Sequence, residues 1–297
     1  MKKNIFLLLV FFLFIAGFGF AQKPAYAIFD ARGKKKEYDR LLNDAGKAQV
    51  VFFGELHDNP ISHWLELELT IDLFEIKQDR LILAAEMFET DDQLLLNEYT
   101  SKFIRKRDFE QEAKLWPNYK TDYAPLVDFA REKGLKFIGS NIPRRYAAIV
   151  NFKDFGGLDS INAYQRALIA PLPIKYDSSL NCYASMKSVF SEGGGPMAHQ
   201  VMHLEKAQAI KDATMGWFII KNLSDGYTLL HFNGSYHSDD FQGTVWYAKD
   251  YARKFPFETR VLTISCVEQD ALDALDESNT GKADYIIVIP TRMTKTY

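Results

Sequence analysis

Short apolar runs alternate with longer amphipathic segments along most of the chain. Each run predicts a strand, because it is short and turn residues bound it. The predicted strands are residues 50–57, 81–87, 135–142, 227–236, 260–267 and 284–290. Apolar side chains recur every four residues after Pro60, which predicts a helix over residues 60–76. The alternation predicts an α/β fold, with a mostly parallel, doubly wound sheet flanked by helices.

The alternation of strands and helices stops over residues 152–198. This segment holds Gly156-Gly157, a loop with Pro171 and Pro173, and a second glycine-rich turn near its end. These turn residues separate short segments of helical character, so we expect a helical insertion over the sheet. A long helix is predicted to follow, over about residues 196–222.

The first 21 residues have the pattern of a secretory signal peptide. Lys2 and Lys3 precede an apolar run over residues 5–16, and Gly19 and Ala21 place small side chains before the expected cleavage site. The run is shorter than the roughly 20 residues of a membrane span, and an uncleaved anchor is the alternative. We therefore expect export to the periplasm or cell envelope, and a mature domain over residues 22–297.

Charge and cysteine content narrow the choice of partners. The formal net charge is −3, and removal of two lysines with the signal peptide would make it more negative. Such a charge argues against nucleic acid as a partner. Cys182 and Cys266 are too few for a disulfide framework, although export would permit a bond between them. No second apolar segment has the length of a span, so membrane association would run through other envelope proteins.

Polar side chains end or follow four of the predicted strands. They are Glu55 with His57, Glu86, Asn141, and Asn233 with His237. The carboxyl ends of parallel strands meet at one edge of a sheet, where α/β proteins bind ligands. We expect Glu55, His57, Glu86 and His237 to converge there, as ligands of a zinc or manganese ion or as an acid–base set. The alternative is a buried hydrogen-bond network, in which the Glu55–His57 pair caps the next helix.

Two further histidines are assigned simpler roles. His63 lies in the predicted helix over residues 60–76 and is expected to be exposed, with support of the strand-end site as the alternative. His231 lies inside a predicted strand and is expected in the core or at the sheet edge.

The start of the predicted long helix is rich in potential iron ligands. His199 and His203 are four residues apart and would share one helix face, with Met202 beside them. Histidine, methionine and tyrosine side chains all bind haem iron, and Tyr183 precedes this helix. We predict that Tyr183, His199 and His203 bind haem; a histidine pair on a solvated face is the alternative.

A second face of the same helix carries polar residues. Gln208, Lys211, Asp212 and Met215 follow the three-to-four spacing of one helix face. This face is turned about half a revolution from His199, so it is expected to pack near the strand ends.

Six segments are distinctive as an ordered set. They are GELHDNPISH at 54–63, AAEMFE at 84–89, WPNYKTDYAPLVDFA at 116–130, GSNIPRR at 139–145, AQAIKDATM at 207–215 and FNGSYH at 232–237. The set, which spreads over about residues 45–290, resembles the ChaN-like family of iron-regulated, haem-binding exported proteins. That family is distantly similar to the Tiki metalloproteases and the erythromycin esterases.

The resemblance implies an α/β fold with helical additions. It also implies haem binding by a tyrosine with histidine assistance, in a homodimer if the site spans two copies. By this resemblance, the strand-end residues Glu55, His57, Glu86, Asn141 and His237 look like the remnant or the working form of the hydrolytic site of the wider superfamily. No family tyrosine aligns with one position here, so Tyr183, His199 and His203 are chosen by their chemistry. The chain lacks the lipoprotein cysteine of some relatives, so a lipid anchor at the amino terminus is not indicated.

Three hypotheses follow from the sequence. The first is an exported haem-binding protein that serves haem or iron acquisition or trafficking. The second is a metal-dependent hydrolase, an esterase or peptidase, that uses the strand-end site. The third is an exported scaffold without either activity. A Soret band on addition of haem distinguishes the first, and bound metal with ester or peptide cleavage distinguishes the second.

Overall fold

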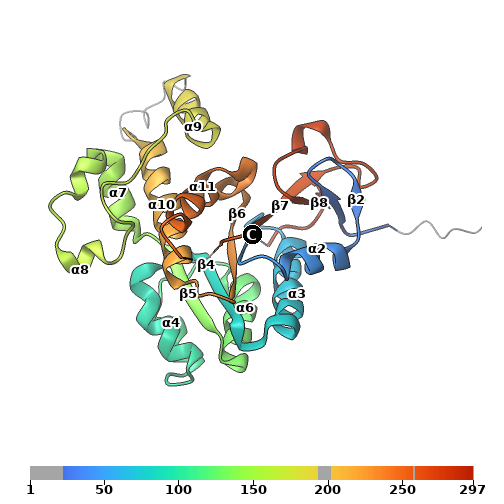
Figure 1. The fold of residues 1–297 in the computed structure, drawn as a ribbon, viewed down its shortest axis with the longest axis horizontal. Coiled ribbons are helices and arrows are strands. Elements are labelled where there is room, and N and C mark those ends of the chain that lie inside the picture. Colours follow the sequence, from blue (N-terminus) through green and yellow to red (C-terminus); the bar gives the residue numbers. More distant parts are fainter. Residues whose placement is uncertain (1–22, 193–201, 257, 297) are drawn as a thin grey trace, which may run out of the picture.

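A single mixed sheet organises the protein. The computed structural model describes residues 23–192, 202–256 and 258–296. Within these residues, eight strands lie in the order β2-β1-β8-β7-β3-β6-β4-β5 (Figure 1). They are β1 (Ala27–Asp30), β2 (Lys35–Lys36), β3 (Val50–Glu55), β4 (Leu81–Glu89), β5 (Lys136–Asn141), β6 (Thr228–Gly234), β7 (Val261–Gln269) and β8 (Tyr285–Pro290). Strands β3 to β8 pair in parallel, which confirms the predicted fold class.

The antiparallel pair β1–β2 at one edge was not predicted. The sequence of residues 22–48 instead predicts a connector with one short helix near residues 37–43. That helix exists as α2 (Tyr38–Ala45), but β1 also pairs with β8, and β2 with β1. Strand β1 has only four residues and β2 consists of two lysines, so neither is long enough to show the alternation of apolar and polar residues that predicts a strand.

Strand β3 lies at the centre of the sheet, and all six of its residues are buried. Val51 and Phe53 belong to the core on one face, and Val50 and Phe52 to the core on the other. Burial on both faces explains why this strand reads as a continuous apolar run. Its register pairs Glu55 with Gly234, so β3 and β6 end at the same level.

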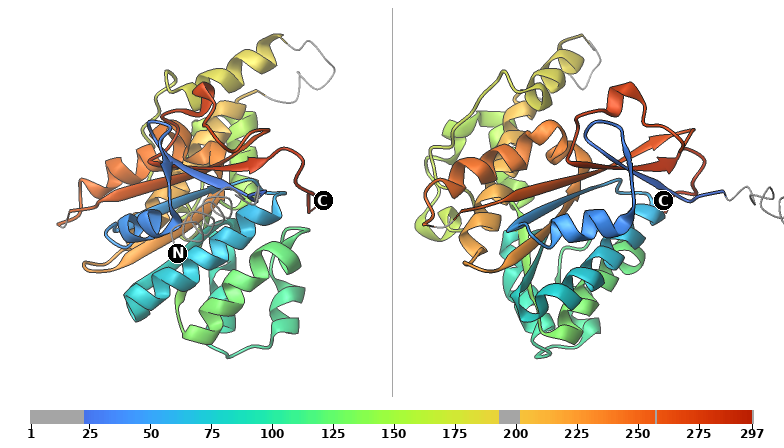
Figure 2. Two further views of the ribbon diagram at one scale, coloured as in Figure 1. Left: turned by 90° about the vertical axis from the view of Figure 1, so that its right-hand side faces the viewer. Right: turned by 45° about the vertical axis from the view of Figure 1, so that its right-hand side comes forward.

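Helices cover both faces of the sheet (Figures 1 and 2). One face packs against α2, α3, α4, α5 and α6, and the other against α9, α10 and α11. The bounds of those not yet given are α3 (Pro60–Lys77), α4 (Gln93–Thr100), α5 (Lys106–Glu112), α6 (Ala124–Lys133), α9 (Asn181–Glu192), α10 (Leu204–Asn222) and α11 (Gly243–Ala252). None of the helices that the structure describes has both the length and the apolar character needed to cross a membrane.

The predicted insertion contains two helices and one short helical turn among its described residues. It begins at the end of α7 (Arg144–Lys153) and contains a short turn at Phe155–Leu158, α8 (Ala163–Arg166) and α9, which project beside α10 (Figure 1). The long helix was predicted to begin near residue 196, but α10 begins at Leu204. His203 is its N-cap, with a non-helical φ of −142°, so the helical spacing that joined it to His199 does not apply.

Candidate functional site

The ends of β3 and β6 border a cavity of about 440 Å³. Residues 55–58 line one side and residues 234–237 the other. The structure therefore brings together Glu55, His57 and His237 at the carboxyl edge of the sheet. Glu86 of β4 joins them, because its Oε1 lies 3.1 Å from Nε2 of His237. The four predicted residues meet, and their roles stay predictions.

Glu55 orients His57. Its buried carboxylate places Oε1 2.5 Å from Nδ1 of His57, and the Tyr123 hydroxyl donates to the same oxygen at 2.8 Å. Burial alone would lower the pKa of His57, but the Glu55 and Glu86 carboxylates raise it. A Cβ on Gly234 would lie 2.5 Å from Nε2 of His57, so this position must be glycine for the ring to keep its place.

His237 lies between two carboxylates. Its Nε2 faces Glu86, and its Nδ1 lies 2.5 Å from Oδ1 of Asp212 on α10. Burial alone would lower the pKa of His237, but these carboxylates raise it to about 10. In turn, His237 and the backbone N–H of Gly234 help to lower the pKa of Glu86 to about 2, against the effect of burial. At neutral pH this arrangement holds an imidazolium between two carboxylates.

The face of α10 that carries Gln208 and Asp212 reaches the strand ends, as its spacing predicted. The Gln208 side-chain nitrogen lies 3.0 Å from Nε2 of His237. Asp212 accepts hydrogen bonds from Tyr183 at 2.7 Å and from Thr244 at 2.9 Å, in addition to its contact with His237. Asp212 therefore holds His237 in place from α10.

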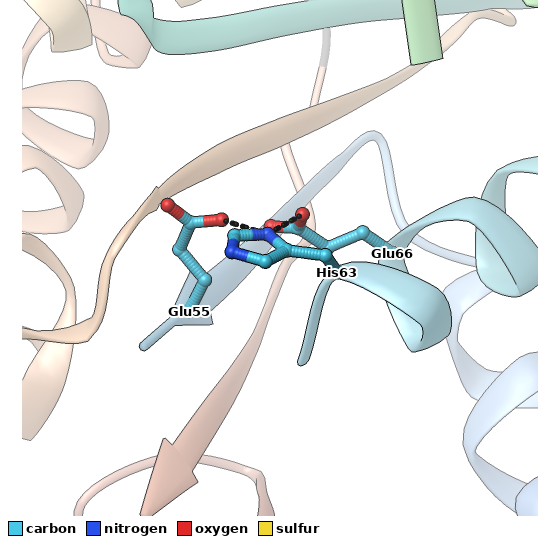
Figure 3. Close-up of side chains that lie close together, drawn as sticks. All are labelled: Glu55, His63 and Glu66. Carbon is cyan, nitrogen blue, oxygen red and sulfur yellow. Dashed lines mark hydrogen bonds and ion pairs between the residues drawn. The ribbon is translucent and has the colours of Figure 1, made fainter. Parts of the chain in front are cut away.

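His63 is buried and not exposed, which corrects the simpler expectation. It lies beside Glu55 and Glu66 (Figure 3). Its Nδ1 lies 3.1 Å from Oε2 of Glu55 and 3.2 Å from Oε2 of Glu66. Burial alone would lower the pKa of His63, but the two carboxylates raise it to about 11. Glu66 itself has a raised pKa, because it is buried and lies beside the charge of Glu55.

Glu55, His63 and Glu66 also form the compact group best suited to a metal. One ligand atom from each lies within 4.8 Å of the others, and no second such group occurs among the described residues. Oε1 of Glu66 is buried without a hydrogen-bond partner in this part of the chain, which fits a position facing a cation or a proton. In contrast, His57 pairs with Glu55 through Nδ1 and His237 pairs with Glu86 through Nε2, so the predicted set of four forms two pairs.

His231 lies in the core, as one of the two expected roles stated. It is fully buried on β6, where its ring nitrogens contact Ser140 and Asn233, each at 2.9 Å. Burial lowers the pKa of His231 to about 4, so the ring is neutral at physiological pH. It supports the strand ends without facing the cavity.

The two predicted haem ligands that the structure describes, Tyr183 and His203, do not share one exposed surface. Tyr183 on α9 is 1% exposed, and its hydroxyl donates to Asp212. His203 is partly exposed at the start of α10. His199 lies outside the described residues. In this arrangement Tyr183 would have to lose its hydrogen bond to Asp212 before it could bind iron.

Two site residues, Glu66 and Tyr123, were missed by the prediction from sequence, whereas a supporting role of His63 was given as the alternative to exposure. A signal for Glu66 existed, since it shares a face of α3 with the buried Leu69 and Leu73. A carboxylate on an apolar helix face requires a buried partner. Tyr123 meets Glu55 across 68 residues of sequence, and no local pattern marks that contact.

The fold and the site together describe an α/β protein that carries two imidazole–carboxylate pairs at the carboxyl ends of its parallel strands. The chain belongs to the family of haem-binding uptake proteins of the Tiki superfamily, ChaN, whose family model matches residues 41–248. The resemblance stated from the sequence is therefore confirmed.

One relative is similar in sequence, and two solved structures share the fold. The chloroplastic protein RETICULATA-RELATED 5 of Arabidopsis thaliana is 26% identical over 267 residues. The match covers 83% of this chain but only 34% of the relative, so the chain spans about a third of that protein's length. A structure of ChaN of Campylobacter jejuni, which concerns cofacial haem binding, has a TM-score of 0.66 at 17% identity and covers 89% of this chain and 96% of its own. A succinoglycan biosynthesis protein has a TM-score of 0.50 at 11% identity, over 90% and 94% of the two chains.

Proposed function

We propose that this protein is exported to the cell envelope and binds haem there, in haem or iron acquisition or trafficking. The match of residues 41–248 to a family of haem-binding uptake proteins carries the proposal. The fold shared with Campylobacter jejuni ChaN, whose structure concerns cofacial haem binding, supports it. A homodimer with haem between two copies is part of the proposal.

The junction of α7 and α10 offers described residues suited to haem. The backbone N–H of His203 donates to the carbonyl of Asn151 at 3.1 Å, which joins the two segments. Beside these residues, Met202 is 63% exposed and Phe152 is 55% exposed. An imidazole and a thioether can ligate haem iron, and a phenyl ring can cover the macrocycle. Of the predicted ligands, His203 therefore has the best support among the described residues.

Haem titration of the mature protein tests this proposal. We expect a Soret band with the wild type, and a His199→Ala/His203→Ala variant that binds haem about tenfold more weakly, because an iron ligand is lost. Tyr183→Phe tests the buried tyrosine, with Tyr164→Phe, at an exposed position, as its matched control. Absence of a Soret band in the wild type would exclude haem binding. Unchanged spectra and affinity in both ligand variants would exclude this location.

Export is tested separately by amino-terminal sequencing of protein taken from the native envelope. The charged start, apolar run and small residues before position 22 lead us to expect a mature chain that begins at Gln22. A mature product that retains Met1 would contradict cleavage.

A metal-dependent hydrolase is the second candidate. It is favoured by one observation: His57 and His237, each oriented by a carboxylate, border one cavity. Oriented imidazoles can move protons in ester or peptide hydrolysis. Zinc or manganese in the purified protein, with cleavage that His57→Ala abolishes, would support this function. A protein without metal or cleavage would leave the pairs as a structural network.

A further inference from the structure

A second cavity adjoins the strand-end site. It lies over the ends of β4 and β5 and has a volume of about 770 Å³, in the range of small-molecule sites. Trp116 lines it and also contacts the His57 ring, with 5.0 Å between the ring centroids. Glu86 lines it as well and pairs with His237. A ligand in this cavity would therefore lie next to both imidazoles.

Most charges on the cavity wall are already paired. Lys114 lies 3.0 Å from Glu89 and 2.7 Å from Asp91, and Arg145 lies 2.6 Å from Asp91. Glu86 is held by His237 and by the backbone N–H of Gly234, as described above. These pairs leave little negative charge on the wall to repel an anion.

Two cations on the same wall have no such partner. Within residues 23–192, 202–256 and 258–296, neither Arg144 nor Lys211 forms an ion pair with a carboxylate, and both line the cavity. Arg144 is also the first residue of α7, where the helix dipole adds positive potential. A guanidinium and an ammonium that face one cavity recognise a carboxylate or a phosphate.

The rest of the cavity wall favours two further features in a ligand, an apolar surface and a hydrogen-bond donor. Leu115, Trp116 and Ile142 supply apolar surface beside the cations. Oδ1 of Asn141 is buried and has no hydrogen-bond partner among the described residues, so it can accept from an N–H or O–H group of a ligand. The wall thus combines an anion site, an acceptor and an apolar surface.

We propose that the cavity lined by Arg144 and Lys211 binds the carboxylate or phosphate of an amphipathic small molecule and lays its apolar body along Trp116, next to His57. This inference does not depend on the described iron-ligand candidates, because neither Tyr183 nor His203 lines the cavity. It supplies a ligand class for the strand-end site whichever function that site has.

N-benzoylglycine is a suitable probe, because it joins an aromatic ring, an amide N–H and a carboxylate. Calorimetric titration of the full mature chain is expected to show binding, and Arg144→Gln/Lys211→Gln is expected to raise Kd about tenfold. The matched control is Arg32→Gln/Lys35→Gln, an exposed pair near the opposite edge of the sheet, which should leave Kd unchanged. Phenyl phosphate in the same titration distinguishes a phosphate ligand from a carboxylate.

Several results would overturn the inference. They are no binding of either probe to the wild type, equal affinity in the Arg144→Gln/Lys211→Gln variant, or equal affinity for the uncharged amide of the probe. Haem titration of the same variant keeps the two proposals separate. Lost probe binding with unchanged haem affinity places the ligands at different sites, and parallel loss identifies haem propionates as the carboxylates. Unfolding midpoints of both double variants check that each is folded.

Discussion

Replacing Glu55 with alanine is expected to lower the free energy of unfolding by about 3–5 kcal/mol, the range for breaking a buried charge pair. Glu55 is 1% exposed, and its carboxylate contacts His57, His63 and Tyr123. Removal leaves the buried imidazolium of His63 with only Glu66 and Asp122 as carboxylate neighbours. Denaturant unfolding measures the effect, with Glu112→Ala, an exposed glutamate, as control. A loss below about 1 kcal/mol, the scale of a surface pair, would show that the network does not stabilise the fold.

The pH dependence of this effect has a defined sign. Burial alone would raise the pKa of Glu55, but hydrogen bonds from His57 and His63 hold it far below the usual 4.5. The stabilisation by its charge is therefore present above pH 4.5 and is lost as the pH falls toward the folded-state pKa. The difference in unfolding free energy between the wild type and Glu55→Gln should shrink below pH 4.5. A constant difference would mean that the charge of Glu55 is not the cause.

Asp212→Ala is expected to cost a similar amount, again about 3–5 kcal/mol. Asp212 is 1% exposed and contacts His237, Tyr183 and Thr244, so its loss removes three polar contacts at once. Tyr183→Phe removes only one of them and should cost about 1 kcal/mol. Equal losses in the two variants would mean that the tyrosine contact carries the whole effect.

Loss of Asp212 should also change the titration of His237. Its pKa is raised to about 10 by Glu86 and Asp212, so the stabilisation from its charge is complete below pH 6.5 and disappears as the pH rises through about 10. In Asp212→Ala, we expect the pKa of His237 to move toward 6.5, as measured by nuclear magnetic resonance of the ring. An unchanged pKa would assign the raised value to Glu86 alone.

The strand-end residues could be found from the sequence because they stand beside strongly apolar runs. Glu55 and His57 come at the end of a short apolar run that is typical of a strand buried on both faces, and His237 follows a second such run. Parallel strands bring such positions together whatever their separation in sequence. The same reasoning could not predict how the side chains pair, because pairing depends on rotamers and on the helices that pack above the sheet. The metal set was therefore predicted as four residues, whereas the compact group is Glu55 with His63 and Glu66.

The expectation for His63 shows the limit of local patterns. Its place in the first turns of α3 suggested exposure, but the loop after β3 and the segment that carries Asp122 cover it, with its Nε2 3.1 Å from the carbonyl of His57. Helix periodicity identifies a face but not what lies opposite that face. Tyr183 is a parallel case, since an insertion that reads as a surface segment places this side chain in the core beside Asp212.

The sequence by itself determined the parallel α/β architecture, the family and the edge of the sheet that carries the polar site. These follow from hydrophobic periodicity and from the order of short motifs, both of which are local properties of the chain. The tertiary structure decided that His57 and His237 are held by different carboxylates, that His63 is buried, and that Arg144 and Lys211 share a wall. Only packing decides these features, because each joins residues from separate elements whose distance and orientation no local pattern encodes.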